Sequence, residues 1–387
     1  MKFMGYRRPD GKVGVRNHVL ILPTVTCANH VARSISLGIK GTMWVEHAHG
    51  CSRLSPDAVQ AARVFVGHGA HPNVFGVVVV GLGCELIRAQ NVAAEIKKQC
   101  PDKPVHVVII QEEGGTFGAV QAGSIAAQKM VLDASLAVRE PIDVSELILG
   151  TECGGSDACS GLSANPALGA ACDLLIDAGG TAILGETPEL MGAEHLLAAR
   201  AVNKDVGARC IETVEEFEKS MKTVGVDLRG TNPSPGNIEG GLSSIEEKSL
   251  GCIYKAGTRP VQDVIKYAQP IEKKGLIFMD TTGNDAEQLS GMVAGGCHIV
   301  VFTTGRGNPM GSPIAPTVKV SSNTFTFEKM RCDMDVNAGT IITGEETVQQ
   351  VGQRIFEEVI AAASGKLTRA EATGHNDFAV WGVWPTV

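Results

Sequence analysis

Cysteine, histidine and acidic side chains occur in segments that have the residue types and spacing of metal ligands. His47, His49 and Cys51 lie within residues 46–52, where alternation along an extended chain would put all three side chains on one face. Cys84 and Cys153 each follow an apolar run that we expect to be a buried strand. Imidazole and thiolate groups suit zinc or iron, and carboxylates could complete a harder site, so the sequence predicts a metal centre. The alternative is that Cys84 and Cys153 only pack in the core, as free cysteines commonly do.

Acidic residues and a histidine follow the predicted strand at residues 181–184. Glu186, Glu189, Glu194 and His195 cluster there, and Glu and His side chains can act as general acid or base. The alternative is a solvated first turn of a helix. Other cysteines lie in helical or undistinguished contexts, and we expect them to pack in the core: Cys100, Cys172, Cys210 and Cys252.

Basic side chains in unusual places are candidates for binding an anion. Arg16 and Asn17 precede the first predicted strand, and Arg306 lies in a glycine-rich turn that could expose backbone N–H groups to a carboxylate. Lys319 lies in the apolar run 316–320, where an unpaired ammonium would be costly. Each could instead form a structural ion pair. Lys319 is the strongest functional candidate, because nothing nearby in the sequence compensates its charge.

Short apolar runs that must position these residues have the composition of buried parallel strands. Helical patterns fall between them, and this alternation predicts an α/β fold. Each run ends in a glycine-rich turn that carries a polar residue. Because ligands bind outside the carboxyl ends of strands in open α/β sheets, we expect the site there. The predicted strands are 19–25, 77–81, 105–111, 147–151, 181–184, 276–280 and 299–304, and the helices include 119–138, 213–223 and 348–360.

The chain has 387 residues, a length that suggests two domains. Arg139, Glu140 and Pro141 interrupt a helical pattern, so we place an N-terminal α/β domain at 1–142 and a C-terminal α/β domain at 143–387. We expect both to be Rossmann-like with mostly parallel sheets, and their strand ends to share one site. The excess of glycine, 46 residues, fits many tight turns at strand ends. Residues 230–242 are a loop by composition, either a linker or an ordered active-site loop.

Composition argues against several classes of protein. A net charge of −8 without a basic stripe argues against nucleic-acid binding. No apolar run approaches the roughly 20 residues of a membrane-spanning helix, and the N-terminus lacks the apolar segment of a secretory signal. The 11 cysteines include no C-x-x-C pair, which indicates reduced thiols and a cytoplasmic location. No dinucleotide fingerprint is complete and no Walker A sequence occurs.

Long motifs resemble those of the altronate/galactarate dehydratase family over nearly the whole chain. The opening segment GYRRPDGKVGVRN (5–17) is similar to the start of the family's catalytic region. The internal motifs that carry the resemblance are HGC (49–51), GLGCE (81–85), TECGGSD (151–157), SANP (163–166), ETPE (186–189), NPSPGN (232–237), GMVAGG (291–296), TTGRG (303–307) and DMDVNAG (333–339).

The resemblance implies a lyase that acts on a hydroxy acid and depends on a divalent metal, Fe²⁺ first, with Mn²⁺ or another ion as alternatives. Full-length family members carry a small extra N-terminal domain, and this sequence begins directly at the catalytic region. That is similar to split members, such as the large subunit of (2R)-sulfolactate sulfo-lyase. The expected partners are therefore a small hydroxy-acid substrate, a small subunit and further copies in a homo- or hetero-oligomer, with no nucleic acid and no membrane.

The resemblance also implies a β-elimination. A base removes the proton beside the carboxylate, a metal or fixed donors stabilise the resulting charge, and water or sulfite leaves to give a 2-keto acid. We assign the base to His49 or His195, with Glu186 as a further catalytic residue. The expected metal ligands are Cys51, Cys84 and Cys153. The expected substrate-binding residues are Arg16, Asn17, Thr304, Arg306, Lys319 and Asn323.

Other functions stay open on the sequence. The leaving group is undecided between water, for a sugar acid of the altronate or galactarate type, and sulfite, for sulfolactate. An iron–sulfur cluster held by three dispersed cysteines is an alternative to a single ion. An oxidoreductase or a non-catalytic scaffold would be a different class, and stoichiometric divalent metal in the purified protein would argue against both.

Overall fold

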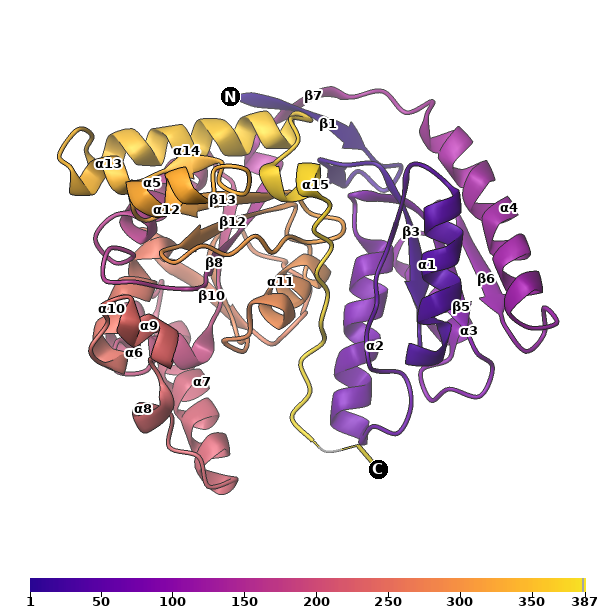
Figure 1. The fold of residues 1–387 in the computed structure, drawn as a ribbon, viewed down its shortest axis with the longest axis horizontal. Coiled ribbons are helices and arrows are strands. Elements are labelled where there is room, and N and C mark those ends of the chain that lie inside the picture. The colour runs from indigo at the N-terminus through magenta and orange to yellow at the C-terminus, as the bar shows by residue number, and fades with distance from the viewer. Residues whose placement is uncertain (385) are drawn as a thin grey trace.

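The computed structural model describes residues 1–384 and 386–387, and two parallel sheets organise the chain (Figure 1). The first sheet has four strands in the order β4-β3-β5-β6. They are β3 (His18–Pro23), β4 (Thr42–Trp44), β5 (Val74–Gly81) and β6 (Val105–Ile109). Helices α1 (Asn29–Gly38) and α4 (Thr116–Ala134) pack on one face, and α2 (Ser55–Ala70) and α3 (Ala89–Gln99) pack on the other.

The second sheet has seven parallel strands in the order β10-β11-β9-β8-β12-β13-β14. The strands are β8 (Ile148–Cys153), β9 (Thr181–Leu184), β10 (Val261–Ile265), β11 (Gly275–Met279), β12 (Ile299–Thr304), β13 (Thr317–Ser321) and β14 (Val336–Asn337). The helices are α5 (Ala164–Asp177), α6 (Glu194–Ala199), α7 (Lys204–Thr223), α8 (Leu228–Thr231), α9 (Pro235–Glu239), α10 (Ile245–Ile253), α11 (Asp285–Ala294), α12 (Thr324–Lys329), α13 (Gly339–Ile342), α14 (Val348–Ala363) and α15 (Arg369–Thr373). Short 3-10 helices span Thr26–Ala28, Val144–Glu146, Thr187–Leu190 and Tyr254–Ala256.

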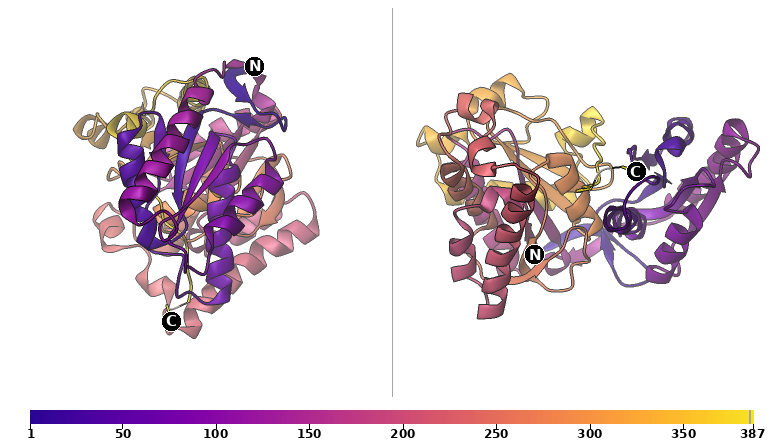
Figure 2. Two further views of the ribbon diagram at one scale, coloured as in Figure 1. Left: turned by 90° about the vertical axis from the view of Figure 1, so that its right-hand side faces the viewer. Right: turned by 90° about the horizontal axis from the view of Figure 1, so that it is seen from below.

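The two sheets share a continuous apolar core. Helices α5, α7, α10 and α14 cover one face of the seven-stranded sheet, and α11 covers the other. Helix α11 also packs against α2 of the first sheet. At that crossing a side chain on Gly67 would meet the carbonyl oxygen of Ala294 at 2.4 Å, so only glycine permits the approach. Residues 374–384 then run between the two halves, as Figures 1 and 2 show, and Asp57 on α2 accepts hydrogen bonds from the backbone N–H groups of Val383 and Trp384.

The predicted α/β class is confirmed, and the predicted strands fall on β3, β5, β6, β8, β9, β11 and β12. A small antiparallel sheet, which was not predicted, has the order β2-β1-β7 and consists of β1 (Lys2–Arg7), β2 (Val13–Gly14) and β7 (Glu140–Asp143). Its pairing of residues 2–5 with residues 140–143 links segments too distant in sequence for local patterns to reveal. No helix among the described residues is long and apolar enough to cross a membrane.

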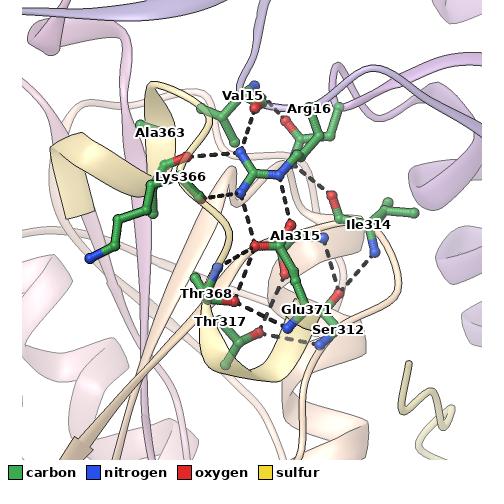
Figure 3. A network of polar contacts seen from close by, with 12 residues as sticks. Val15, Arg16, Ser312, Ile314, Ala315, Thr317, Ala363, Lys366, Thr368 and Glu371 are labelled. Atoms are coloured by element: carbon green, nitrogen blue, oxygen red, sulfur yellow. Dashed lines mark hydrogen bonds and ion pairs between the residues drawn. The ribbon is translucent and has the colours of Figure 1, made fainter. Parts of the chain in front are cut away.

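Arg16 forms a buried tie between the start of the chain and α15 (Figure 3). Its guanidinium binds both carboxylate oxygens of Glu371 at 2.7 and 2.9 Å. The remaining N–H groups donate to the carbonyl oxygens of Val15, Ala362 and Lys366. Because these contacts use all five guanidinium donors, Arg16 has none left for a substrate, contrary to the role we expected.

Asn17 is also occupied by the protein. Its amide donates to the carbonyl oxygen of Ala134, and its side-chain oxygen accepts from Arg8. Both residues of this predicted pair therefore serve to join segments of the fold. The alternative of a structural ion pair holds for Arg16.

We expect Arg16→Met to lower the free energy of unfolding by about 3–5 kcal/mol, because the Glu371 carboxylate would stay buried without its partner. The matched control is Arg7→Met, which breaks the pair with Glu140, where both side chains are about half exposed, 46% and 50%. That change should cost less than about 1 kcal/mol. Urea denaturation followed by circular dichroism measures both values. Equal losses in the two variants would contradict the assignment of Arg16 as a structural tie.

Buried histidines make the fold sensitive to acid. Burial lowers the pKa of His68 and of His298 to about 4, and burial together with His298, His68 and Lys103 lowers the pKa of His71 well below 6.5. The unfolded chain takes up these protons near pH 6.5, whereas the folded chain does not. The stability they confer is therefore complete above about pH 6.5 and is lost as the pH falls toward about 4.

We expect His68→Leu to reduce the loss of unfolding free energy between pH 6.5 and 4 by about 3 kcal/mol, because this side chain no longer takes up a proton on unfolding. Denaturation midpoints measured at several pH values test the difference. An unchanged slope in His68→Leu would mean that this imidazole is already protonated in the folded protein.

Candidate active site

A cavity of about 620 Å³ opens at the carboxyl ends of the central strands of the seven-stranded sheet. The turns that follow β8, β9, β11 and β12 contribute to its wall, as expected for this fold. Helix α7, helix α8 and the segment around α9 close the other side. The loop predicted at residues 230–242 is thus an ordered part of the cavity wall, with Thr231, Asn232, Ser234 and Asn237 facing the space.

Four potential metal ligands meet beside this cavity. Cys153, Glu186, Glu189 and Cys252 are all buried, and each offers a ligand atom within 4.8 Å of the others. The Sγ atom of Cys153 lies 3.6 Å from Oε2 of Glu186 and 3.7 Å from Oε2 of Glu189. The Sγ atom of Cys252 lies 3.6 Å from the same Glu186 oxygen. We call these four side chains the Cys₂Glu₂ cluster.

Two lysines neutralise the Cys₂Glu₂ cluster. The Lys255 ammonium is fully buried and contacts both the Glu186 carboxylate and, at 3.2 Å, the Sγ atom of Cys153. The Lys248 ammonium lies 2.5 Å from Oε1 of Glu189 and also donates to the side-chain oxygens of Asn232 and Asn237. Lys248 also lines the cavity, so its positive charge acts both on the cluster and on the space where a ligand would lie.

The electrostatics of the cluster favour a thiolate. A hydrogen bond from the Cys252 thiol, helped by the Lys255 and Lys248 ammoniums, holds the pKa of Cys153 well below its usual range. The same hydrogen bond, with burial, raises the pKa of Cys252 well above its usual range. Burial raises the pKa of Glu189 to about 8 even though Lys248 opposes the shift. A cluster that holds protons on Cys252 and Glu189 would release them when a cation binds.

The donor set fits a divalent metal ion. Thiolate and carboxylate are ligands for zinc or ferrous iron. Four deprotonated ligands would be balanced by a divalent cation together with the ammonium groups of Lys255 and Lys248. Without a cation, the two lysines can balance two negative charges. Burial raises the pKa of Glu189, and the hydrogen bond to Cys153 together with burial raises the pKa of Cys252, so these two groups keep their protons.

Local backbone features aim these side chains inward. Glu186 has a φ of 63°, in the left-handed region that non-glycine residues rarely adopt. Its N–H donates to the Thr281 hydroxyl, and its Oε1 accepts from the backbone N–H of Cys153. A side chain at the preceding Gly185 would meet Thr281 and Gln288 at less than 3 Å. This backbone strain is retained at the cluster, as is common at functional sites.

The cavity wall also carries an acidic and a basic group. Asp285, in the first turn of α11, lines the cavity and accepts a hydrogen bond from Asn308. Arg306 also lines it and holds the carbonyl oxygen of Gly236 and the carboxylate of Glu239. The sequence-predicted Arg306 and Cys153 therefore meet at one cavity, and Glu186 lies directly behind it in the cluster.

Lys319 lies behind the wall, in a row across neighbouring strands. Strand register places Glu152 of β8 opposite Phe302 of β12, and Phe302 opposite Lys319 of β13. The Lys319 ammonium sits 3.3 Å from the centre of the Phe302 ring. Neither the Lys319 ammonium nor the Glu152 carboxyl group has a hydrogen-bond partner, and both side chains are fully buried. The uncompensated ammonium expected from the sequence is present.

Two other predicted substrate-binding residues belong to the scaffold. The Thr304 hydroxyl accepts from the N–H of Gly307 inside the turn after β12. Asn323 donates to the Asp157 carboxylate and caps α12 by accepting from the N–H of Thr326. Thr304 and Asn323 therefore stabilise the turns that carry Arg306 and Gly155.

The structure separates the predicted metal ligands. Cys153 belongs to the Cys₂Glu₂ cluster, whereas Cys51 and Cys84 are exposed on turns of the four-stranded sheet. His49 is also in that half of the fold, and His195 is exposed on α6. Neither histidine lines the cavity in the described part of the chain. These residues are separated because Cys51 and Cys84 follow strands of the four-stranded sheet, whereas Cys153 follows a strand of the seven-stranded sheet.

Sequence reasoning missed Lys248, Cys252 and Lys255. Cys252 was expected only to pack, yet it completes the cluster. The three residues follow helical spacing on α10 and the 3-10 helix after it, which places them on one face. Two lysines and a cysteine on the buried side of a helix were the available signal, since lysine is almost never fully buried without a partner.

Comparison with known proteins agrees with the resemblance found in the sequence. The profile described as D-galactarate/altronate dehydratase, C-terminal, matches residues 144–386, and the one described as D-galactarate dehydratase/altronate hydrolase, second domain, matches residues 5–135. The chain is 37% identical to altronate dehydratase of Bacillus subtilis, over 98% of this chain and 77% of that protein. It is 39% identical to (2R)-sulfolactate sulfo-lyase subunit beta of Chromohalobacter salexigens, over 97% and 96%. Galactarate dehydratase (L-threo-forming) of Escherichia coli is 36% identical, over 99% and 77%. The chain therefore belongs to the D-galactarate/altronate dehydratase family and is a lyase.

Proposed function

We propose that this lyase is metal-dependent and performs β-elimination on a 2-hydroxy carboxylic acid in the cavity beside the Cys₂Glu₂ cluster. The observation that carries the proposal is the convergence of two thiols, two carboxylates and two ammonium groups at the carboxyl ends of β8 and β9. Cys153, Cys252, Glu186 and Glu189 would hold the metal, Fe²⁺ first and Mn²⁺ as the alternative. When bound, the ion would stabilise the negative charge that forms beside the substrate carboxylate.

Groups in the cavity wall can supply the remaining chemistry. The Lys248 and Arg306 cations would attract and orient the substrate carboxylate. Asp285 lines the cavity and is not one of the four cluster side chains, so we assign to its carboxylate the removal of the proton on the carbon beside the substrate carboxylate. Departure of the β-substituent with its electron pair would leave an enol, which tautomerises to a 2-keto acid. This assignment replaces His49 and His195, which do not line the cavity.

The wall favours a polyhydroxylated substrate. Thr231, Asn232, Ser234 and Asn237 place hydroxyl and amide groups around a space of about 620 Å³. Such groups can bond to several substrate hydroxyls, and a site built to do so rejects analogues that lack them. We therefore propose dehydration of a sugar acid of the altronate or galactarate type.

The second candidate is release of sulfite from (2R)-sulfolactate. It is favoured by the 39% identity to a sulfo-lyase subunit beta of which the match covers 96%. That relative is named as a subunit, so we also propose a small partner subunit for this chain.

An anaerobic assay of the purified chain tests these proposals. Altronate, galactarate and sulfolactate are each supplied with Fe²⁺ or Mn²⁺, with and without the candidate small subunit, and 2-keto acid and sulfite are measured. Formation of 2-keto acid from a sugar acid without sulfite supports the first candidate. Sulfite in equal amount with 2-keto acid from sulfolactate supports the second. Activity that persists after the metal has been removed by a chelator would exclude both metal-dependent mechanisms.

A further inference from the structure

Three exposed cysteines lie on turns at one edge of the four-stranded sheet. Cys27 follows β3, Cys51 lies in the segment after β4, and Cys84 follows β5. Strands β4, β3 and β5 are parallel neighbours, so their carboxyl ends lie at the same edge. Six of the other eight cysteines are buried, which is the usual state of a free cysteine. Three exposed thiols at one edge are therefore unusual.

Hydrogen bonds hold the three turns together. The N–H of Thr26 donates to the carbonyl oxygen of His49 at 3.0 Å, and the N–H groups of Leu86 and Ile87 donate to that of Gly50 at 3.0 and 3.1 Å. Gly50 has a φ of 105°, and a side chain there would meet the Thr24 carbonyl oxygen at 2.1 Å. The segment that carries Cys51 is thus pressed against both the Cys27 turn and the Cys84 turn.

The buried Glu85 fixes the third turn. Its two carboxylate oxygens accept from the N–H of Gly83, at 2.6 Å, and from the hydroxyl of Thr24, at 3.2 Å. The Cys84 turn is therefore tied to the loop that leads to Cys27. This arrangement presents three thiols on a braced backbone rather than on free loops.

The edge is also prepared for negative charge. Helices α1, α2 and α3 begin just after Cys27, Cys51 and Cys84 respectively, and none of the three has a side-chain hydrogen bond at its N-cap. Helix N-termini stabilise thiolates and offer unpaired N–H groups to anionic sulfur. In addition, His49 is only 8% exposed, and its Nδ1 atom is buried without a hydrogen-bond partner. His49 adjoins the Cys51 turn in sequence, so an unsatisfied polar atom lies in the same segment as one of the three thiols.

We propose that Cys27, Cys51 and Cys84 hold an iron–sulfur cluster, at a site separate from the Cys₂Glu₂ cluster. Each thiol would give up its proton on binding, and cysteine thiolates are the usual protein ligands of such clusters. A single ion needs its ligand atoms close together, and among the described residues only the Cys₂Glu₂ group brings such atoms within 4.8 Å of one another. Three sulfurs spread over the turns of three strands suit the wider span of a cluster.

The test uses the whole chain, purified without oxygen and reconstituted with equal amounts of ferrous and ferric iron and with inorganic sulfide. We expect acid-labile sulfide and iron in matching amounts with broad visible absorption. Each of Cys27→Ser, Cys51→Ser and Cys84→Ser should lower the sulfide content about tenfold or more, with an unchanged circular dichroism spectrum. Cys332→Ser, which removes an exposed thiol from a different region, is the matched control and should keep the full content.

Cys153→Ser separates this inference from the proposed function. That variant should keep its acid-labile sulfide while it loses the single divalent ion. If the wild-type chain binds no sulfide after reconstitution, or binds a metal at these thiols without sulfide, the inference is wrong. It is also wrong if the triple serine variant keeps its sulfide. None of these results bears on the Cys₂Glu₂ cluster, whose own failure would appear as full divalent metal content and activity in Cys153→Ser.

Discussion

Cys153→Ser should remove the divalent metal from the Cys₂Glu₂ cluster and lower kcat by about 100-fold or more. The serine hydroxyl keeps the size of the side chain, but its oxygen stays protonated where Cys153 is held as a thiolate by Cys252, Lys255 and Lys248. Metal ligands must be deprotonated to bind, and changes even in the groups that support ligands cost 10–100-fold in metal affinity or activity. Elemental analysis of dialysed protein, alongside the 2-keto acid assay, measures both effects.

Cys172→Ser is the matched control for this prediction. Cys172 is buried like Cys153, and its Sγ atom contacts the carbonyl oxygen of Lys255 at 3.4 Å, next to the cluster but outside it. Burial raises the pKa of Cys172, so a neutral hydroxyl is a close substitute for its thiol. We expect full metal content and nearly full activity. Loss of metal in both variants would point to a general effect of buried serine and would remove the support for Cys153 as a ligand.

Lys319→Met should make the protein more stable and less active. The Lys319 ammonium is fully buried over Phe302 and has no hydrogen-bond partner, and burial lowers its pKa to about 7. Methionine has a similar shape without the charge, so we expect the free energy of unfolding at neutral pH to rise by about 1–4 kcal/mol. We expect kcat to fall by about 100-fold, because the Lys319 ammonium interacts electrostatically with Asp285, the carboxylate to which we assign proton removal.

The pH dependence of the unfolding free energy shows whether the added stability of Lys319→Met comes from removal of the buried ammonium. In the unfolded chain the lysine titrates near 10.4, whereas in the folded chain its pKa is about 7. The folded protein therefore binds this proton less tightly than the unfolded chain does. The destabilising effect of Lys319 decreases as the pH rises from about 7 to about 10. The advantage of Lys319→Met should be largest below pH 7 and should shrink across that range. A variant with full activity would show that Lys319 has no catalytic or positioning role.

Local patterns in the sequence were sufficient for most of the sheet. Strands such as Ile299–Thr304 and Thr181–Leu184 match their predicted limits because parallel strands are buried on both faces and so form continuous apolar runs. The short strand Thr42–Trp44 and the pairing of β1 with β7 were missed. Short strands carry little periodicity, and β1 pairs with a strand about a third of the chain away.

The candidate site was predictable to the extent that it follows strands. Cys153 and Glu186 come directly after β8 and β9, where the fold class places ligands. Lys248, Cys252 and Lys255 come from a helix that reaches the same point only after a long excursion through α6–α9. A helix face gives no indication in sequence of which strand end it will meet.

The sequence by itself determined the α/β class, the family and the habit of placing polar residues at strand ends, because these depend on local composition and on motifs read directly from the chain. The tertiary structure alone decided which of those ends belong together. It brought Cys153 at the end of β8 together with Cys252 on α10, which covers one face of the same sheet, and it left Cys51 and Cys84 with Cys27 on the other sheet. The physical reason is that strand order, and not distance along the chain, sets which turns adjoin.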